Sequence, residues 1–370
     1  MKKEKIVLGM SGGVDSSVAA FLLQNKGFEV HGIFMKNWDD KNAICNAEDD
    51  YADALNVCNQ LNISLKKINY TKEYKKRVFN QFLEDHKNGL TPNPDVLCNK
   101  EIKFDVFQKY AKEIGATKIA SGHYAKIVRS GNNYSICKAL DSSKDQSYFL
   151  YQLSSEILEN IEFPLGDILK KDIRKIAQEN NLINASKKDS TGICFIGDRK
   201  YNDFVSQFLK SSKGKIVTVD GEEIGAHNGH MYFTVGQRKG LGIGARESAF
   251  DKPWYVVNKD IDNNIVYVAQ GTNHPALFSD EIIADKMFWN LDIQKKISLQ
   301  CNAKVRYRDI DHSCQILSSK EGQCYIKFND KIKAITTGQS IVLYDKNGVC
   351  LGGGIIRKRN IPFLNKEINE

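Results

Sequence analysis

Ser11-Gly12-Gly13-Val14-Asp15-Ser16-Ser17 lies between an apolar run at 5–10 and a stretch of helical spacing at 16–26. Glycines let a backbone approach a ligand closely, and successive N–H groups at a helix N-terminus bind anions. The hydroxyls of Ser16 and Ser17 add donors, and Asp15 can hold Mg²⁺. The stretch therefore predicts a strand, a phosphate-binding loop and a helix, in that order.

This loop contains no lysine. A Walker A loop ends in Gly-Lys-Ser or Gly-Lys-Thr, and its lysine reaches the β- and γ-phosphates. The stretch 11–17 instead resembles the pyrophosphate-binding (PP) loop of the N-type ATP pyrophosphatases. That resemblance implies cleavage between the α- and β-phosphates and adenylation of a substrate oxygen. A glycine-serine turn without a ligand is the competing interpretation, which its position before a helix disfavours.

Outward from the loop, the first half of the chain alternates strands with helices. Strands are expected at 5–10, 29–35, 64–68 and 118–121, and helices at 16–26, 51–61, 74–87 and 102–114, the last ending at Gly115 in an αL cap. This alternation predicts an α/β domain with a parallel sheet covered on both faces.

After about residue 200 short β-rich runs separated by glycines dominate. They lie at 214–219, 232–235, 254–257, 265–268, 303–307, 324–328 and 340–343. This pattern predicts a small central β-rich domain and a C-terminal β-barrel. The expected domains are 1–203, the PP-loop ATP pyrophosphatase domain, 204–280, the central β domain, and 281–362, the barrel, with a frayed tail at 363–370.

The composition excludes several classes of protein. With 41% hydrophobic and 26% charged residues among 370, the chain is an ordinary multidomain globular protein without a membrane-spanning stretch. The apolar run after the N-terminal lysines is too short for a signal peptide, so a cytoplasmic location is expected.

The nine cysteines form no CxxC pair and should be reduced thiols, and no metal site is expected at His227 and His230. A net charge of +8 favours a polyanionic partner, although a lysine-rich proteome would give the same excess.

Two motifs combine cysteine with polar neighbours. Asn93 can cap a helix with Pro94 at its first position, which sets Asp95 and Cys98 three residues apart on one face. A helix N-terminus lowers a thiol pKa whereas a carboxylate raises it, so Asp95 is expected to exchange protons. Cys194 lies between glycines in 189–197, and a second thiol near Cys98 would permit persulfide chemistry ending in a disulfide. Ordinary buried packing is the alternative for each cysteine.

Eight motifs, in order, carry a closer resemblance: SGGVDSS, FMKNW, NPDVLCNKEIKF, SGHYA, KDQSYFLY, STGICFIG, YFTVGQRKGLGIG and PWYVV. Together they resemble the bacterial tRNA-specific 2-thiouridylases over about residues 5–360. The resemblance implies a pyrophosphatase domain, a central β domain and a C-terminal barrel. It also implies ATP-dependent formation of 2-thiouridine at the wobble position of tRNAs for Lys, Glu and Gln.

The same resemblance implies a role for each matching residue. ATP, with Mg²⁺, would be bound by Gly9, Met10, Ser11, Gly12, Gly13, Val14, Asp15, Ser16, Met35 and Gly122. Cys194 would carry a persulfide, Cys98 would close a disulfide with it, and Asp95 would be the general acid/base. The sulfur would attack C2 of the adenylated uridine while bound to Cys194 or after release as sulfide.

Contacts with tRNA are implied for Asn93, Pro94, Asp95, Lys144, Asp145, Gln146, Arg306 and Tyr307. Independently of the resemblance, Arg306-Tyr307-Arg308 suits phosphate pairing and base stacking. A cysteine desulfurase or a sulfur-relay protein is the expected sulfur donor, and a monomer is expected. An iron–sulfur cluster on Cys98, Cys194 and a third ligand is the weaker alternative, because no third cysteine motif is present.

Two other functions compete with thiolation. An amide- or amidine-forming pyrophosphatase would keep the adenylation step and need no paired thiols. A nucleotide-sensing RNA-binding protein without turnover would need no Asp15 in the loop.

Overall fold

The computed structural model describes residues 3–39, 47–189, 193, 195–197, 199–243, 252–290, 298–320 and 322–362. The chain forms two compact units. The first comprises residues 1–80, 94–199 and 347–351, and the second comprises residues 81–93, 200–346 and 352–370. In the described residues no helix is long and apolar enough to cross a membrane.

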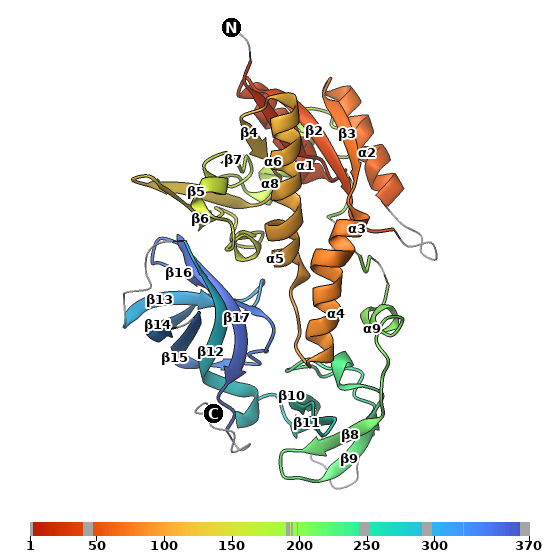
Figure 1. The fold of residues 1–370 in the computed structure, drawn as a ribbon, viewed down its shortest axis with the longest axis vertical. Coiled ribbons are helices and arrows are strands. Elements are labelled where there is room, and N and C mark those ends of the chain that lie inside the picture. The colour runs from red at the N-terminus through yellow and green to blue at the C-terminus, as the bar shows by residue number, and fades with distance from the viewer. Residues whose placement is uncertain are drawn as a thin grey trace. The chain divides into compact units, whose positions relative to one another are not determined.

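The first unit is built on a parallel sheet of order β3-β2-β1-β4-β7 (Figure 1). Its strands are β1 (Lys5–Gly9), β2 (Glu29–Lys36), β3 (Ser64–Asn69), β4 (Lys118–Ala120) and β7 (Ile161–Glu162). The helices and π turns (η1, η2) of this unit before β4 are α1 (Val14–Asn25), α2 (Ala47–Gln60), α3 (Thr71–Tyr74), η1 (Lys75–Phe79), α5 (Pro94–Cys98), η2 (Asn99–Lys103) and α6 (Phe104–Ile114). Between η1 and α5 comes α4 (Asn80–Lys87), which belongs to the second unit from residue 81 onward. After β4 come the hairpin β5 (Ala125–Ser130) and β6 (Asn133–Lys138), η3 (Ser147–Phe149), α7 (Ser155–Leu158) and α8 (Lys170–Glu179).

Side-chain alternation along β1 decides which helix covers which face. Ile6 and Leu8 pack into a core with residues of α1, α2 and α8. On the opposite face Phe107 of α6 packs where a side chain of Gly9 would stand, and Figure 1 shows α6 crossing the sheet. The predicted parallel sheet, covered on both faces, is therefore confirmed.

The second unit contains the two β structures. The central sheet has the order β10-β11-β8-β9, and the C-terminal strands close into a barrel of order β12-β15-β14-β13-β16-β17. The elements are α9 (Tyr201–Val205), β8 (Gly214–Thr218), β9 (Glu223–His227), η4 (His230–Tyr232), β10 (Trp254–Asp260), β11 (Ile265–Gln270), η5 (Pro275–Leu277), β12 (Phe278–Trp289), β13 (Leu299–Lys304), β14 (His312–Lys320), β15 (Gln323–Lys333), β16 (Ser340–Tyr344) and β17 (Cys350–Arg359). The predicted central β domain and C-terminal barrel are confirmed.

One predicted strand is wrong, and a second is confirmed only in its first two residues. Residues 232–235 form no strand, because the Gln237 side chain accepts from Thr234 N at 3.0 Å and closes a turn there. The strand predicted at 303–307 ends at Lys304, and Arg306 lies in the bend and turn that follow. In 303–307, charged residues alternate with apolar or aromatic ones, a pattern common to exposed strands and to turns, so it did not show where the strand ends.

Candidate active site

The PP loop connects the end of β1 to the start of α1. Gly12 has a φ of 76°, and a Cβ there would collide with the backbone oxygen of Asp50. Gly13 is the N-cap of α1 and makes no side-chain cap hydrogen bond. The N–H groups of the first turn of α1 are therefore available to an anion.

Serine hydroxyls fold the loop onto the helix. Ser16 Oγ donates to Gly13 O at 2.9 Å and accepts from Ser11 N at 3.2 Å. Ser17 Oγ donates to the same carbonyl at 3.1 Å. Met10 and Val14 are buried in the core on either side of this loop. The loop thus has the glycine-rich, hydroxyl-lined form that the sequence predicts.

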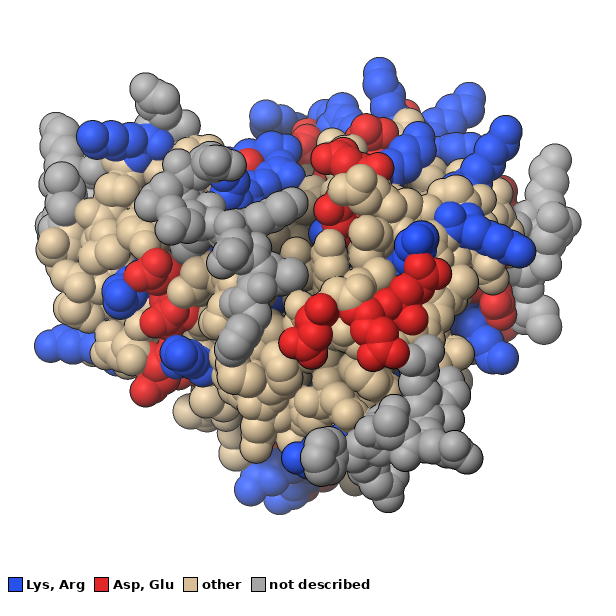
Figure 2. Space-filling model, turned by 90° about the horizontal axis from the view of Figure 1, so that it is seen from below, with Lys and Arg blue, Asp and Glu red and all other residues tan. Residues whose placement is uncertain are grey.

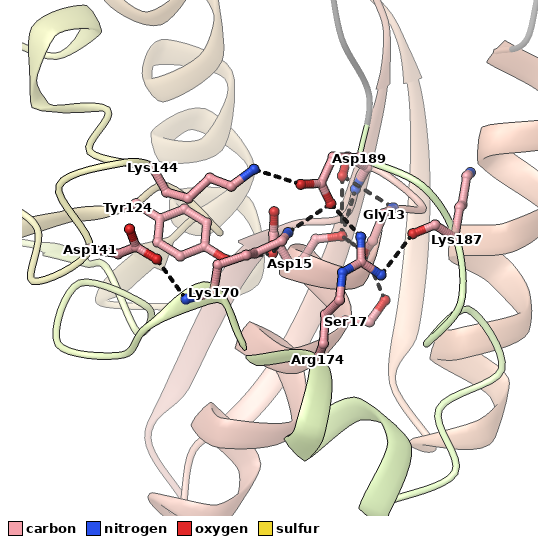
Figure 3. A network of polar contacts seen from close by, with 12 residues as sticks. Gly13, Asp15, Ser17, Tyr124, Asp141, Lys144, Lys170, Arg174, Lys187 and Asp189 are labelled. Carbon is pink, nitrogen blue, oxygen red and sulfur yellow. Dashed lines mark hydrogen bonds and ion pairs between the residues drawn. The ribbon is translucent and has the colours of Figure 1, made fainter. Parts of the chain in front are cut away.

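Asp15 lies in a network of charged side chains drawn in Figure 3. Its Oδ1 accepts from Lys170 Nζ at 2.6 Å and from Tyr124 Oη at 2.7 Å. Lys170, at the start of α8, also pairs with Asp189 at 2.9 Å. A lysine from a helix far away in the sequence therefore lies beside the PP loop, which has none of its own.

Asp189 forms ion pairs with three cationic side chains. Besides Lys170, it pairs with Lys144 at 2.8 Å and with Arg174 at 2.7 Å. Burial alone would raise the pKa of Asp189, but hydrogen bonds and charges from Lys144 and Lys170 outweigh it and lower the pKa to about 2. Asp189 consequently stays ionised at neutral pH and holds these cations beside the loop.

The sequence patterns did not identify Lys170, Arg174, Tyr124 or Asn184 as site residues. Tyr124 belongs to the SGHYA motif, and Asp189 directly precedes STGICFIG, so these motifs could have drawn attention to them. Lys170, Arg174 and Asn184 belong to none of the eight motifs. Only the packing of α8 and of the turn after it brings them to the loop.

The residues at strand ends that are expected to bind ATP lie on β1, on β2 and directly after β4. A Cβ on Gly122 would lie 3.1 Å from Ser16 N, so this glycine lies directly against the start of α1. Met35 is half-buried near the end of β2, next to β3. The glycine at position 9 is accounted for by the packing of Phe107, and a nucleotide is not needed to explain it.

The Asp95–Cys98 motif forms the short helix α5, which begins at Pro94 as expected. Asn93 directly precedes this helix and is half-buried, and Cys98 is 6% exposed. Burial raises the pKa of the Asp95 carboxyl, although the positive charge of Lys103 opposes that shift. A carboxyl in this state holds a proton more readily than a solvated aspartate does.

Lys103 links this helix to the SGHYA strand end. Its ammonium donates to His123 Nε2 at 3.3 Å, so His123 carries its proton on Nδ1 and donates it to Ser121 Oγ at 2.6 Å. Burial and the charge of Lys103 lower the pKa of His123 well below its usual value, which keeps the imidazole neutral.

Cys194 lies outside the described residues. The next residue, Phe195, is fully buried and packs against Trp38, Tyr74 and Phe79. The chain is thus fixed to the first unit immediately after the expected sulfur carrier.

The three expected tRNA contacts at 144–146 all make contacts within the chain. Lys144 pairs with Asp189, as described above. Asp145 is 3% exposed and accepts from Ala139 N at 3.0 Å and from Ser147 Oγ at 3.0 Å. Gln146 exchanges two hydrogen bonds with the backbone of Tyr124 at 2.8 and 2.9 Å.

In the second unit Arg306 and Tyr307 lie on the turn after β13. The Arg306 guanidinium donates to Lys333 O at 2.9 Å and pairs with Asp309 at 3.4 Å. Arg308 is exposed and lies 5.9 Å from the Tyr307 ring centroid, while Ile310 is 72% exposed. This turn therefore presents a cation, an aromatic ring and an aliphatic side chain together.

The lysine and arginine side chains do not form one continuous positive patch on the face shown in Figure 2. Groups of acidic side chains lie among them. Within the described ranges, no group of three or more His, Cys, Asp or Glu side chains could hold a metal ion.

Comparison with known families matches most of the chain. Residues 4–198 match the family described as tRNA methyl transferase HUP domain, 202–270 its PRC-barrel domain, and 279–356 the aminomethyltransferase beta-barrel domain.

Individual relatives are similar over almost their full length. The chain is 51% identical to the tRNA-specific 2-thiouridylase MnmA 1 of Geobacillus kaustophilus, covering 96% of each chain. It is 50% identical to the tRNA-specific 2-thiouridylase MnmA of Klebsiella pneumoniae, covering 96% of this chain and 98% of the relative. Among solved structures, the U34-tRNA thiolase NcsA of Methanococcus maripaludis with its 4Fe-4S cluster is 17% identical, with a TM-score of 0.35 over 55% of this chain and 63% of that one.

Proposed function

The chain belongs to the family of tRNA-specific 2-thiouridylases, and from this premise we propose how its residues divide the reaction. The enzyme is a tRNA-uridine 2-sulfurtransferase that uses ATP. We propose the wobble uridine of tRNAs for Lys, Glu and Gln as its target, and the cytoplasm as its location.

The observation that carries the ATP step is the lysine-free PP loop at the N-terminus of α1. The proposed reaction is attack of the uridine O2 on the α-phosphorus, with pyrophosphate leaving toward the N–H groups of the loop. The carboxylate of Asp15 suits Mg²⁺, which prefers one or two carboxylates together with substrate phosphates and would supply neutralisation of phosphate charge. Lys170, 2.6 Å from Asp15, supplies a cation for the phosphates from α8.

Sulfur transfer is assigned to Cys194 and Cys98. A cysteine desulfurase or relay protein loads Cys194 as a persulfide, whose terminal sulfur attacks C2 and displaces AMP. The Cys98 thiolate then attacks Sγ of Cys194, which releases the thiouridine and leaves a Cys98–Cys194 disulfide. A dithiol reductant restores both thiols with two electrons. Release of sulfide from Cys194, followed by its attack on C2, is the alternative order of the same bond changes.

Asp95 is the proposed general acid/base for these transfers. Its support is the raised pKa of a carboxyl on the same short helix as Cys98. Asn93, Pro94 and Asp95 are proposed to meet the uridine after it leaves its stack. We propose the disulfide route over an iron–sulfur cluster because no cysteine of this chain lies in a CxxC pair.

Of the residues expected to meet tRNA, we propose that some contact the nucleic acid and that the others hold the surrounding chain in place. Arg308 and Tyr307 reach the nucleic acid, whereas Arg306 shapes the turn through Lys333 O and Asp309. In the first unit Lys144 can exchange Asp189 for a phosphate, while Asp145 and Gln146 hold the surrounding loop. The protein is proposed to act as a monomer.

The test combines purified protein, unmodified tRNA, Mg-ATP and a persulfide donor, with thiolated tRNA detected by retarded migration in a mercury-containing gel. Wild type should shift the tRNA and release AMP, and Cys98→Ser and Cys194→Ser should each abolish the shift. Cys58→Ser, a matched change at a buried cysteine of α2, should retain activity. Thiolation that survives both active-site substitutions would overturn the assignment of sulfur transfer to Cys98 and Cys194. AMP release by wild type without any shift of the tRNA would favour nitrogen chemistry instead.

A further inference from the structure

Asn184 is a buried amide behind the PP loop, in the turn after α8. We propose that Asn184 is the positioning residue that turns the loop's carbonyls inward and so exposes its N–H groups to pyrophosphate. The inference rests on the proposed nucleotide site and adds a residue outside the loop to it.

The side chain of Asn184 makes two hydrogen bonds to the loop. It is 5% exposed, and its Nδ2 donates to Gly12 O at 2.9 Å and to Ser17 Oγ at 2.9 Å. An amide nitrogen carries two hydrogens, so each bond can use one of them. Because both acceptors belong to the nucleotide loop and its helix, the contact acts directly on the loop's conformation.

The bond to Gly12 O sets the direction of the next peptide N–H. A trans peptide is planar, with its C=O and N–H pointing in opposite directions. When Asn184 holds the Gly12 carbonyl inward, the Gly13 N–H points outward, where it meets Ser11 Oγ at 3.4 Å on the exposed side. A contact of that length is weak, so a phosphate oxygen can replace it at little cost.

The hydrogen bond from Asn184 to Ser17 orients the Ser17 hydroxyl, so that it too holds a loop carbonyl inward. Since Ser17 Oγ accepts a hydrogen from Asn184, its own hydrogen is directed to Gly13 O, 3.1 Å away. The carbonyls of Gly12 and Gly13 are thereby both bonded on the protein side. An arriving anion then meets donors, and it is not repelled by two carbonyl oxygens.

The turn that carries Asn184 is itself held firmly. Gln60 of α2 bonds Asn181 O at 2.8 Å and Ile183 N at 3.2 Å, and Arg174 of α8 donates to Ala185 O at 3.1 Å. In the described part of the chain Asn184 Oδ1 is buried without a partner, which costs stability. An apolar residue of the same size would avoid that cost but could not supply the two donor hydrogens to Gly12 O and Ser17 Oγ.

The inference is tested by calorimetric titration of the full-length protein with Mg-pyrophosphate and, separately, with adenosine. Asn184→Leu keeps the side-chain size and removes both donors. We expect pyrophosphate to bind about tenfold more weakly and adenosine within about twofold of wild type. Asn180→Leu is the matched control, because Asn180 is exposed and its amide donates to Ile176 O of α8, away from the PP loop, so both affinities should stay unchanged.

A second pair of variants keeps the test decisive if Asn184→Leu does not fold. Asn184→Thr retains one hydroxyl donor and Asn184→Ala retains none, so the threonine variant should bind pyrophosphate more tightly than the alanine variant. Equal pyrophosphate affinity across the position-184 variants and wild type, or parallel losses for both ligands, would overturn the positioning role alone. If wild type bound no pyrophosphate, the proposed nucleotide site would fail as well.

Discussion

At the scale of single residues, the main finding beyond the PP loop itself is the positively charged Lys170 of α8, which lies beside the loop. Lys170 bridges Asp15 and Asp189 with a side chain that is only 11% exposed. In a partly buried setting such a cation interacts strongly with nearby phosphates. Lys187 is a useful comparison, because it bridges Asp50 and Asp53 of α2 in the same manner and does not contact Asp15.

Lys170→Met should therefore lower kcat/KM for ATP by roughly a hundredfold, as removal of a charged donor at a reacting phosphate does. Steady-state AMP release at varied ATP, with saturating tRNA, measures this effect. Lys187→Met should change kcat/KM little. Equal losses in the two variants would mean that Lys170 only supports the fold.

The pKa of Asp95 gives a prediction for pH dependence. The positive charge of Lys103 lowers that pKa against the effect of burial, so Lys103→Met should raise it further. The limb of the thiolation pH–rate profile that reports Asp95 should move to higher pH. Lys100→Met, at an exposed lysine paired with Glu101 on the same π turn, should leave the limb where it is. An unchanged limb in Lys103→Met would remove Asp95 as the titrating group.

At the scale of elements, the residues before α5 are fixed by the barrel's own turn within the second unit. Thr91 N donates to Thr337 O at 2.9 Å, and Gln339 Nε2 donates to Thr91 O at 2.8 Å. Gly338, between them, has a φ of 90°, and a Cβ there would lie 2.6 Å from Thr91 N. The turn thus accepts only glycine, both for its backbone angle and for its contact with Thr91.

Gly338→Ala should lower the free energy of unfolding by about 2 kcal/mol or more. Gly221→Ala is the control, since Gly221 has a similar φ of 91° but no atom within 4 Å of the point where its Cβ would stand. Chemical denaturation monitored by circular dichroism gives both values. The excess loss at position 338 measures the contact with Thr91, and equal losses would show that backbone strain alone acts there.

At the scale of the whole molecule, a net charge of +8 makes binding to tRNA dependent on salt. Arg308 is an exposed cation on the turn after β13, whereas the guanidinium of Arg306 is bonded within the protein. Arg308→Ala should therefore reduce the slope of log affinity against log salt concentration by about one. Filter binding between low and moderate salt measures the slope. Arg306→Ala should weaken binding with a smaller change in slope, and the reverse ranking would assign the phosphate contact to Arg306.

Local features were predictable wherever neighbouring residues determine the backbone. The glycines of 11–17, the proline that opens α5 and the αL glycine at 115, with a φ of 67°, all act within one turn of chain. The same holds for the alternation of strands and helices that predicted the parallel sheet. Where one pattern fits two structures, the prediction failed at 232–235 and beyond Lys304 in 303–307. At 232–235 the side chain of Gln237 accepts from Thr234 N, and after Lys304 the side chain of Arg306 donates to the distant Lys333 O.

The sequence by itself determined the lysine-free phosphate loop, the order of α/β and β domains, and the helix that carries Asp95 and Cys98. Only the tertiary structure decided which cation lies beside the loop, because Lys170 is 155 residues from Asp15 and reaches it through the packing of α8 beside α1. The same holds for Asn184 behind Gly12, and for the burial of Asp145. Propensity and spacing act over a few residues, whereas ion pairs and buried amides depend on which distant surfaces the hydrophobic core brings together.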